Sequence, residues 1–285
     1  MKRQFVTAAA CMTIAAHGTV SAAVQIHAVV VDGPSGVVQV TEDRPIFHTL
    51  SLIKNSTSAS ASGDLRSGVL RAEAVTRPET GANGTSFAAV EVMAGDLITF
   101  AQGASGTAYV DWGFDGSLDI EPNGPNPNNV SSAYLGFSIT SPSGTATSLR
   151  LATVTANANC SGASTQYCVT GPFSHAEVAM RGSVPFEIRA GTFALSFALG
   201  ASVRGGDDAY FGNTTYLYLR LPANVNFTSG SGVFLANAVP VPAPVPEPAT
   251  SLLLAGGCLA LIATRRWRAH SESVGSKGTI LHGDA

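Results

Sequence analysis

An uncharged, mostly apolar run near the carboxyl end restricts this chain more than any other feature of its sequence. Residues 249–264 carry no charge, and Arg265, Arg266 and Arg268 follow them at once. As a helix this run reaches about 24 Å, slightly short of a hydrocarbon core of about 30 Å, so it spans a bilayer if its flanks contribute. Because basic residues mark cytoplasmic flanks, we expect residues 265–285 to form a basic stop and a polar cytoplasmic tail. A helix buried in a soluble core is the alternative, which the arginines disfavour.

A short rigid motif lies directly before this run. Val245, Pro246, Glu247 and Pro248 end a segment, residues 239–248, in which proline alternates with small apolar residues. Such a segment favours an extended, semi-rigid spacer, and its prolines prevent a helix from starting before residue 249.

The order of motif, apolar run and basic stop resembles the C-terminal recognition sequence of the PEP-CTERM protein-sorting family, whose members are substrates of exosortase. Residues 208–215 and 227–235 are similar to the last strands of such proteins. The resemblance implies cleavage near residues 246–248 and transfer of the exported part to the cell surface and its exopolysaccharide. A permanent membrane anchor without processing is the alternative.

The N-terminus is typical of an exported protein. Lys2 and Arg3 precede an apolar stretch at residues 5–16, and small residues at 20–22 fit signal peptidase. We therefore expect a signal peptide at residues 1–23, handled by the secretion translocon and cut after Ala22 or Ala23. An uncleaved anchor is the alternative. The expected product is an inner-membrane precursor whose mature form lies at the cell surface or outside the cell.

Composition excludes one class of partner. Charged residues make up only 12% of the chain, against about 25% in an ordinary soluble domain. With a net charge of −3 and few scattered arginines, the chain offers no basic face, so nucleic acid is not an expected partner.

Residues 24–238 show the period-two alternation of β-strands and hardly any helical periodicity. The clearest strand alternates leucines with polar or aromatic residues: Leu217, Leu219 and Leu221 with Tyr216, Tyr218 and Arg220. Further strands are expected at residues 24–31, 87–92, 97–100, 135–139, 149–155, 184–190 and 192–199. Many short strands separated by turn residues predict one all-β domain, a β-sandwich with a jelly-roll-like arrangement. Residues 55–63 and 121–129 are expected to be long surface loops.

Two cysteines remain between the targeting segments. Cys160 and Cys168 flank a polar loop, and in an exported protein such a pair predicts a disulfide that stabilises the fold by about 2–3 kcal/mol. A metal or redox site is the alternative, but neither C-x-x-C spacing nor a nearby histidine pair supports it.

One acidic segment allows two interpretations. Asp111, Asp115 and Asp119 surround a glycine somewhat as ligands surround calcium, although the spacing departs from the EF-hand pattern. The favoured interpretation is a hairpin whose turn is formed by Asp115 and Gly116. Apart from this calcium alternative, no metal or cofactor is expected.

No motif of a nucleophilic, metal-dependent or phosphate-binding enzyme occurs, so the expected role is structural or adhesive. A carbohydrate-binding module is one alternative, in which Trp112, Tyr109 or Tyr134 would stack on sugar rings. A jelly-roll enzyme acting on polysaccharide is another, because such enzymes use two carboxylates. The strand residues considered for that role are Glu73, Glu91 and Glu187.

Overall fold

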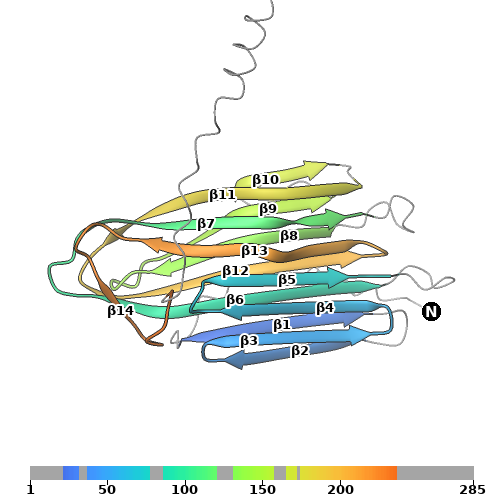
Figure 1. Cartoon of the computed structure of the whole chain (residues 1–285), viewed down its shortest axis with the longest axis horizontal. Helices are drawn as coiled ribbons and strands as arrows, with labels where there is room; N and C mark the ends of the chain where they lie inside the picture. The colour runs from blue at the N-terminus through green and yellow to red at the C-terminus, as the bar shows by residue number, and fades with distance from the viewer. Residues whose placement is uncertain are drawn as a thin grey trace, which may run out of the picture. The chain divides into compact units, whose positions relative to one another are not determined.

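The computed structural model describes residues 22–31, 37–77, 86–120, 131–156, 165–171 and 174–235, and these residues form two packed β-sheets (Figure 1). The strand axes of the two sheets are nearly aligned, as in aligned β-sandwiches. The predicted all-β, two-sheet architecture is therefore confirmed. Among these residues there is no helix long and apolar enough to cross a membrane.

Sheet A has the order β10-β9-β8-β12-β6-β1-β2, and β14 also pairs with β6. Its strands are β1 (Ala23–Val31), β2 (Val37–Arg44), β6 (Phe87–Phe100), β8 (Ser131–Thr140), β9 (Ala146–Ala156), β10 (Thr165–Gly171), β12 (Gly191–Arg204) and β14 (Phe227–Ser229). Sheet B has the order β11-β7-β13-β5-β4-β3. Its strands are β3 (Phe47–Lys54), β4 (Thr57–Asp64), β5 (Val69–Val75), β7 (Gly106–Asp119), β11 (His175–Ile188) and β13 (Asp208–Arg220). Strand pairs are antiparallel, except that β9 and β10 are parallel.

The strand pairs are nested along the chain. β5 pairs with β13 in sheet B, β6 with β12 in sheet A, β7 with β11 in sheet B, and β8 with β9 in sheet A. Such alternation between two sheets is the strand order of a jelly roll. Because β13 is inserted between β5 and β7, the outer face of sheet B combines early and late parts of the sequence.

The core lies between the sheets and follows the alternation of the strands. Phe193, Leu195, Phe197 and Leu199 on β12 share one buried face, as predicted. Each such side chain contributes about 1.5–3 kcal/mol when it is removed from water. The ring of Phe193 meets Phe100 edge to face at 5.6 Å, a favourable aromatic geometry.

Residues 227–235 close one end of the sandwich. Phe234 is buried and stacks on Phe197 of sheet A with 6.1 Å between ring centroids. The backbone nitrogen of Leu235 donates to the carbonyl of Leu65, which lies between β4 and β5 of sheet B, at 2.8 Å. The last described residues are therefore attached to both sheets.

Two predicted strands, at residues 87–92 and 97–100, prove to be one strand, β6. The prediction of two strands is wrong because Gly95 and Asp96 interrupt the apolar pattern within a single strand. Asp96 is fully buried, and its carboxylate accepts hydrogen bonds from the backbone nitrogen of Leu97 at 2.8 Å and from Ser231 Oγ at 2.5 Å. A partner far along the chain thus permits a carboxylate inside the strand.

The surface loop predicted at residues 55–63 is wrong, because most of it forms β4. Ala59 and Ala61 point into the core and are buried, while serines at 58, 60 and 62 point outward. The alternation was present in the sequence, but small residues gave it too little hydrophobic contrast. The loop predicted at residues 121–129 lies outside the described residues.

Candidate functional site

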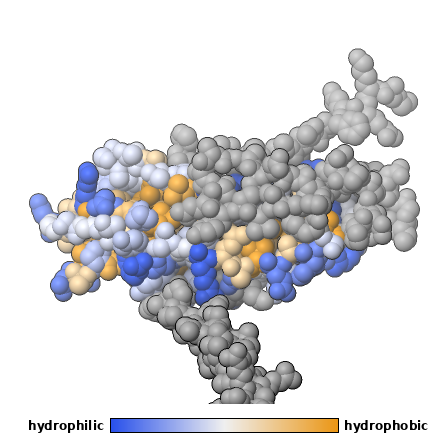
Figure 2. Space-filling view, turned by 90° about the horizontal axis from the view of Figure 1, so that it is seen from above, coloured by the Kyte–Doolittle hydropathy of each residue, from blue (hydrophilic) through white to orange (hydrophobic). Residues whose placement is uncertain are grey.

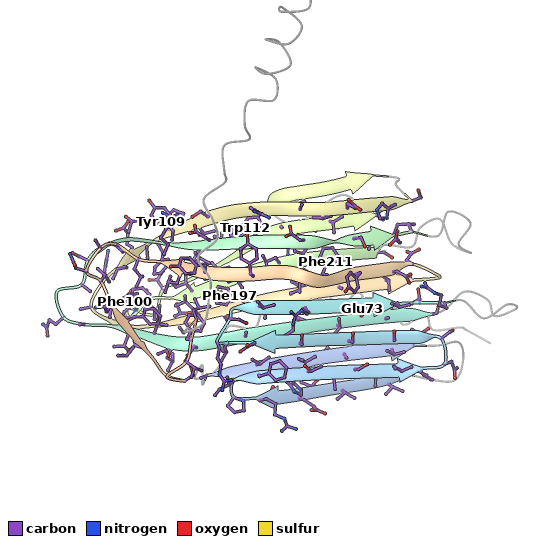
Figure 3. All side chains as sticks on the ribbon, viewed as in Figure 1. Glu73, Phe100, Tyr109, Trp112, Phe197 and Phe211 are labelled. Atoms are coloured by element: carbon purple, nitrogen blue, oxygen red, sulfur yellow. The ribbon has the colours of Figure 1, made fainter. Side chains whose placement is uncertain are left out.

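A hollow of about 280 Å³ lies on the outer face of sheet B, over β4 and β5. We call it the β4 trough, and the polar and aromatic side chains of its lining are Thr49, Ser60, Ser62, Arg71, Glu73 and Tyr210. Tyr210 is 42% exposed. Figure 3 shows Glu73 on β5, toward the end of the sheets opposite to Phe100 and Tyr109.

Strand register assembles this trough from four strands. Tyr210 on β13 lies directly opposite Glu73 on β5, which lies opposite Ser60 on β4. In the adjacent row, Arg71 lies opposite Ser62, which lies opposite Thr49 on β3. Alternate residues of a strand share a face, so both rows point outward together.

The hollow results from side-chain size. At the trough the outward residues of β4 are Ser60 and Ser62, which are shorter than the arginine, glutamate and tyrosine beside them on β5 and β13. None of the trough residues except Glu73 was singled out from the sequence. The Ser/Ala alternation of residues 57–64 was the signal available there.

An irregularity in β13 orients the trough residues. The pairing of β13 with β5 shifts between Phe211 and Thr215, and the carbonyl of Gly212 accepts a 2.8 Å hydrogen bond from Arg71 Nε. A Cβ at Gly212 would lie 2.8 Å from the Tyr210 ring, so only glycine lets the ring lie over this position. Bulges are known to re-aim side chains in this way.

A second polar cluster lies on the same face, around Tyr109. Arg220 donates through Nε to Asp111 Oδ2 at 2.8 Å and through Nη2 to Oδ1 at 2.9 Å, and its guanidinium lies 4.3 Å from the centroid of the Tyr109 ring. Ser183 Oγ also donates to Asp111 at 2.5 Å. These hydrogen bonds, chiefly those from Arg220, lower the pKa of Asp111.

The predicted turn at Asp115 and Gly116 is wrong, because β7 continues without interruption from Gly106 to Asp119. A Cβ at Gly116 would lie 2.4 Å from the carbonyl oxygen of Tyr210, so glycine serves close strand approach here. Asp111, Asp115 and Asp119 follow one another at four-residue intervals, about 13 Å apart along a strand. One calcium ion binds oxygens at about 2.3–2.6 Å, so these three carboxylates do not form the proposed loop site.

Two of these three carboxylates have protein partners instead. Asp111 binds Arg220, and a carboxylate oxygen of Asp119 lies 2.5 Å from His175 Nδ1. The hydrogen bond and charge of Asp119 raise the pKa of His175. No group of three metal-ligating residues occurs within the described part of the chain.

Trp112 is not a sugar platform, since it is only 1% exposed and belongs to the core. Inward and outward residues alternate along β7, and Trp112 falls on the inward side. Its ring lies against Gly182 on β11, where a Cβ would come within 2.5 Å of it.

Tyr134 lies on the outer face of sheet A and is held by three other residues. The guanidinium of Arg150 lies 4.0 Å from the centroid of its ring, and its hydroxyl donates to the carboxylate of Glu91. The ring crosses Gly200 on β12 to reach that carboxylate. Burial raises the pKa of Glu91, and burial together with the Glu91 charge raises the pKa of Tyr134.

The three glutamates considered for catalysis are not brought together. Glu91 belongs to sheet A, whereas Glu73 and Glu187 belong to sheet B. In sheet B they lie on β5 and β11, three strands or about 14 Å apart across the sheet. Glu187 accepts a hydrogen bond from Thr107 instead.

A larger hollow, of about 510 Å³, lies near one end of the sandwich. Phe186, Phe193, Ile139 and Pro142 supply its apolar lining, and Glu187 supplies a carboxylate. Figure 2, which looks onto an edge of the sandwich, shows hydrophobic residues at the left end among hydrophilic ones.

Several predicted features fall outside the described residues. These are residues 1–21 of the predicted signal peptide, Cys160, the motif at residues 245–248, the apolar run at 249–264, and Arg265, Arg266 and Arg268. Ala23, the last residue of the predicted signal peptide, is described and begins β1. Cys168 lies on β10, but its side chain is not described. The disulfide and the membrane helix therefore stay predictions.

Comparison with known proteins decides the nature of the C-terminal segment. A family model described as the PEP-CTERM protein-sorting motif matches residues 244–268. This chain carries a PEP-CTERM sorting motif. The match covers the predicted Val-Pro-Glu-Pro motif, the apolar run and the basic stop. The PEP-CTERM motif is a substrate signal for exosortase. It therefore implies export and a cell-surface or membrane-associated location.

The remaining comparisons add little about the sandwich. No curated protein matches the chain. One solved structure, described as TmCBM61 in complex with beta-1,4-galactotriose, matches with 9% sequence identity and a TM-score of 0.25. The match covers 62% of this chain and 88% of that chain. A similarity this weak supports no conclusion about fold or ligand.

Proposed function

We propose that this PEP-CTERM chain is an exported protein that exosortase sorts to the cell surface, where its β-sandwich serves a structural or adhesive role in exopolysaccharide. The observation that carries this proposal is the sorting motif at residues 244–268. In the proposed pathway the signal peptide at residues 1–23 directs export, and the apolar run holds the precursor in the inner membrane. Exosortase then cuts near residues 246–248.

The sandwich is assigned no catalytic step. The candidate acids lie on different sheets or distant strands, and Asp111 and Asp119 have protein partners. The surface hollow beside Tyr210 suits a binding role, because an aromatic ring gives a large contact area and a tyrosine adds a polar hydroxyl.

The sorting proposal is tested by the mass of the surface form. Replacing Glu247 with Gln or Pro246 with Ala keeps the apolar run and its arginines, so membrane insertion is expected to continue. Maturation should stop, and the precursor should accumulate with its C-terminal segment attached. Intact-mass measurement of the membrane and surface fractions shows whether the precursor is inserted and whether it is matured.

Glu272→Gln is the matched control, since it removes a carboxylate beyond the basic stop. It should mature normally. A surface form of unchanged mass in the Glu247→Gln strain, or a wild-type surface form that retains residues 249–264, contradicts the proposal.

A further inference from the structure

We propose that the β4 trough binds a pyranose unit of a neutral polysaccharide, with Tyr210 as the stacking ring and Arg71 and Glu73 as its hydrogen-bonding groups. This inference rests on the proposed function, because it names the site and the ligand class through which the sandwich would adhere to exopolysaccharide.

The trough has the form of a ligand site. It is a hollow with one large aromatic side chain, two charged groups and several hydroxyls converging on it from β3, β4, β5 and β13. Binding sites combine an apolar surface with a few placed polar groups in this way. Because Ser60 and Ser62 are small, the trough leaves room for a polysaccharide chain to lie across β4.

Tyr210 supplies the apolar surface. Its ring lies over Gly212, and 42% of its surface is exposed beside the trough. One face of a pyranose ring presents carbon-bound hydrogens, which pack on an aromatic ring much as other apolar groups do. Because the Tyr210 ring already packs on the backbone at Gly212, it loses little conformational entropy when a ligand stacks on it.

Arg71 and Glu73 supply complementary hydrogen bonds. Arg71 uses Nε to bind the Gly212 carbonyl at 2.8 Å, which fixes the plane of its guanidinium beside the trough. Glu73 accepts a long hydrogen bond of 3.4 Å from Ser60 Oγ on β4, and a carboxylate has several further acceptor positions. Neighbouring sugar hydroxyls both donate and accept, so a donor and an acceptor on one strand match them.

The charges of the trough favour a neutral ligand. Arg71 and Glu73 are the charged side chains of its lining, and their formal charges cancel. An anionic polymer would meet the Glu73 carboxylate, and a cationic one would meet the Arg71 guanidinium. Like charges brought together without compensation weaken binding.

The test uses the full-length chain purified in detergent micelles and run in native gels that contain a soluble polysaccharide. The probes are a β-glucan, a galactan, a xylan and the exopolysaccharide of the organism that makes the protein. We expect retardation by at least one neutral probe. Tyr210→Ala should weaken it by about tenfold or more, as truncation of a central aromatic contact does.

Tyr218→Ala is the matched control, because Tyr218 lies on the same strand and the same face but outside the trough. It should keep wild-type retardation. Glu73→Gln should weaken binding several-fold, and each variant should keep the wild-type melting temperature because these side chains lie outside the core.

The inference is overturned if no probe retards the wild-type chain, or if Tyr210→Ala and Tyr218→Ala bind alike. It is equally overturned if the exopolysaccharide is the one probe that binds, proves to be acidic, and no longer binds when salt is added. Exosortase takes no part in this assay, so its failure leaves the sorting proposal standing. A failed maturation test likewise leaves the binding result intact.

Discussion

Tyr134 lies flat across Gly200, its direct cross-strand partner, and a Cβ on Gly200 would stand 2.4 Å from the tyrosine ring. The same pairing of an aromatic residue with a directly opposite glycine occurs at Trp112 and Gly182 in the core and at Tyr216 and Gly113 on the outer face of sheet B. In each pair the ring covers backbone that glycine leaves open. These glycines therefore lie within strands, where they make room for an aromatic ring, and they do not form turns.

Gly200→Ala is expected to lower the free energy of unfolding by about 1–3 kcal/mol, because the new methyl group must displace the Tyr134 ring. Urea denaturation measures the loss. The double variant with Tyr134→Ala tests the cause. With the ring removed, adding the methyl group should cost much less, so the two changes should be strongly non-additive. Additive losses would show that the ring and the glycine do not interact.

Stability should also depend on pH through Glu91. Burial raises the pKa of this carboxyl in the folded state above its ordinary value of 4.5. The folded state then holds a proton that the unfolded state has already lost, so stability falls as pH rises from about 4.5 through the folded pKa. Glu91→Gln cannot ionise and should lose this part of the pH dependence. Urea denaturation of both proteins from pH 4 to pH 8 measures the difference.

Tyr134→Phe is a second test of how the pKa of Glu91 affects stability. The tyrosine hydroxyl stabilises the ionised form of Glu91, so its removal should raise the pKa of Glu91 further. The fall in stability should then become larger and extend to higher pH. Identical pH profiles for wild type, Glu91→Gln and Tyr134→Phe would contradict the role assigned to burial.

The pairing of Asp111 with Arg220 predicts the opposite pH dependence. Hydrogen bonds from Arg220 hold the pKa of Asp111 below 3.8, so its contribution to stability is present above that pH and is lost as pH falls through the folded pKa. Because Arg220 is half exposed, Asp111→Asn should cost only about 0.5–1 kcal/mol at pH 7.

This cost should shrink toward zero near pH 2, as measured by urea denaturation at both pH values. Asp43→Asn on β2 is the matched control, since Asp43 is an exposed carboxylate on the other sheet. It should change stability little at either pH. A loss from Asp111→Asn that stays constant down to pH 2 would mean that the effect is not electrostatic.

Some β-strands could be read from the sequence because burial follows side-chain alternation. The strand with Leu217 and Leu219 is present as predicted, with both leucines buried. The same reasoning failed at residues 57–64, where alanine and serine differ too little in hydrophobicity, and at Asp96, whose carboxylate is buried because Ser231 binds it. Local patterns do not contain such distant partners.

The sequence by itself determined the sorting motif, since the Pro-Glu-Pro element, the apolar run and the arginines are contiguous in the chain and match the PEP-CTERM model at residues 244–268. It also determined the all-β class, because the period of two is a property of each strand. Only the tertiary structure decided that Trp112 is buried, that Asp115 and Gly116 lie within a strand, and that Tyr210 faces Glu73 and Ser60. The physical reason is that strand pairing brings distant residues into register, and that pairing also fixes which side of the sheet each side chain occupies.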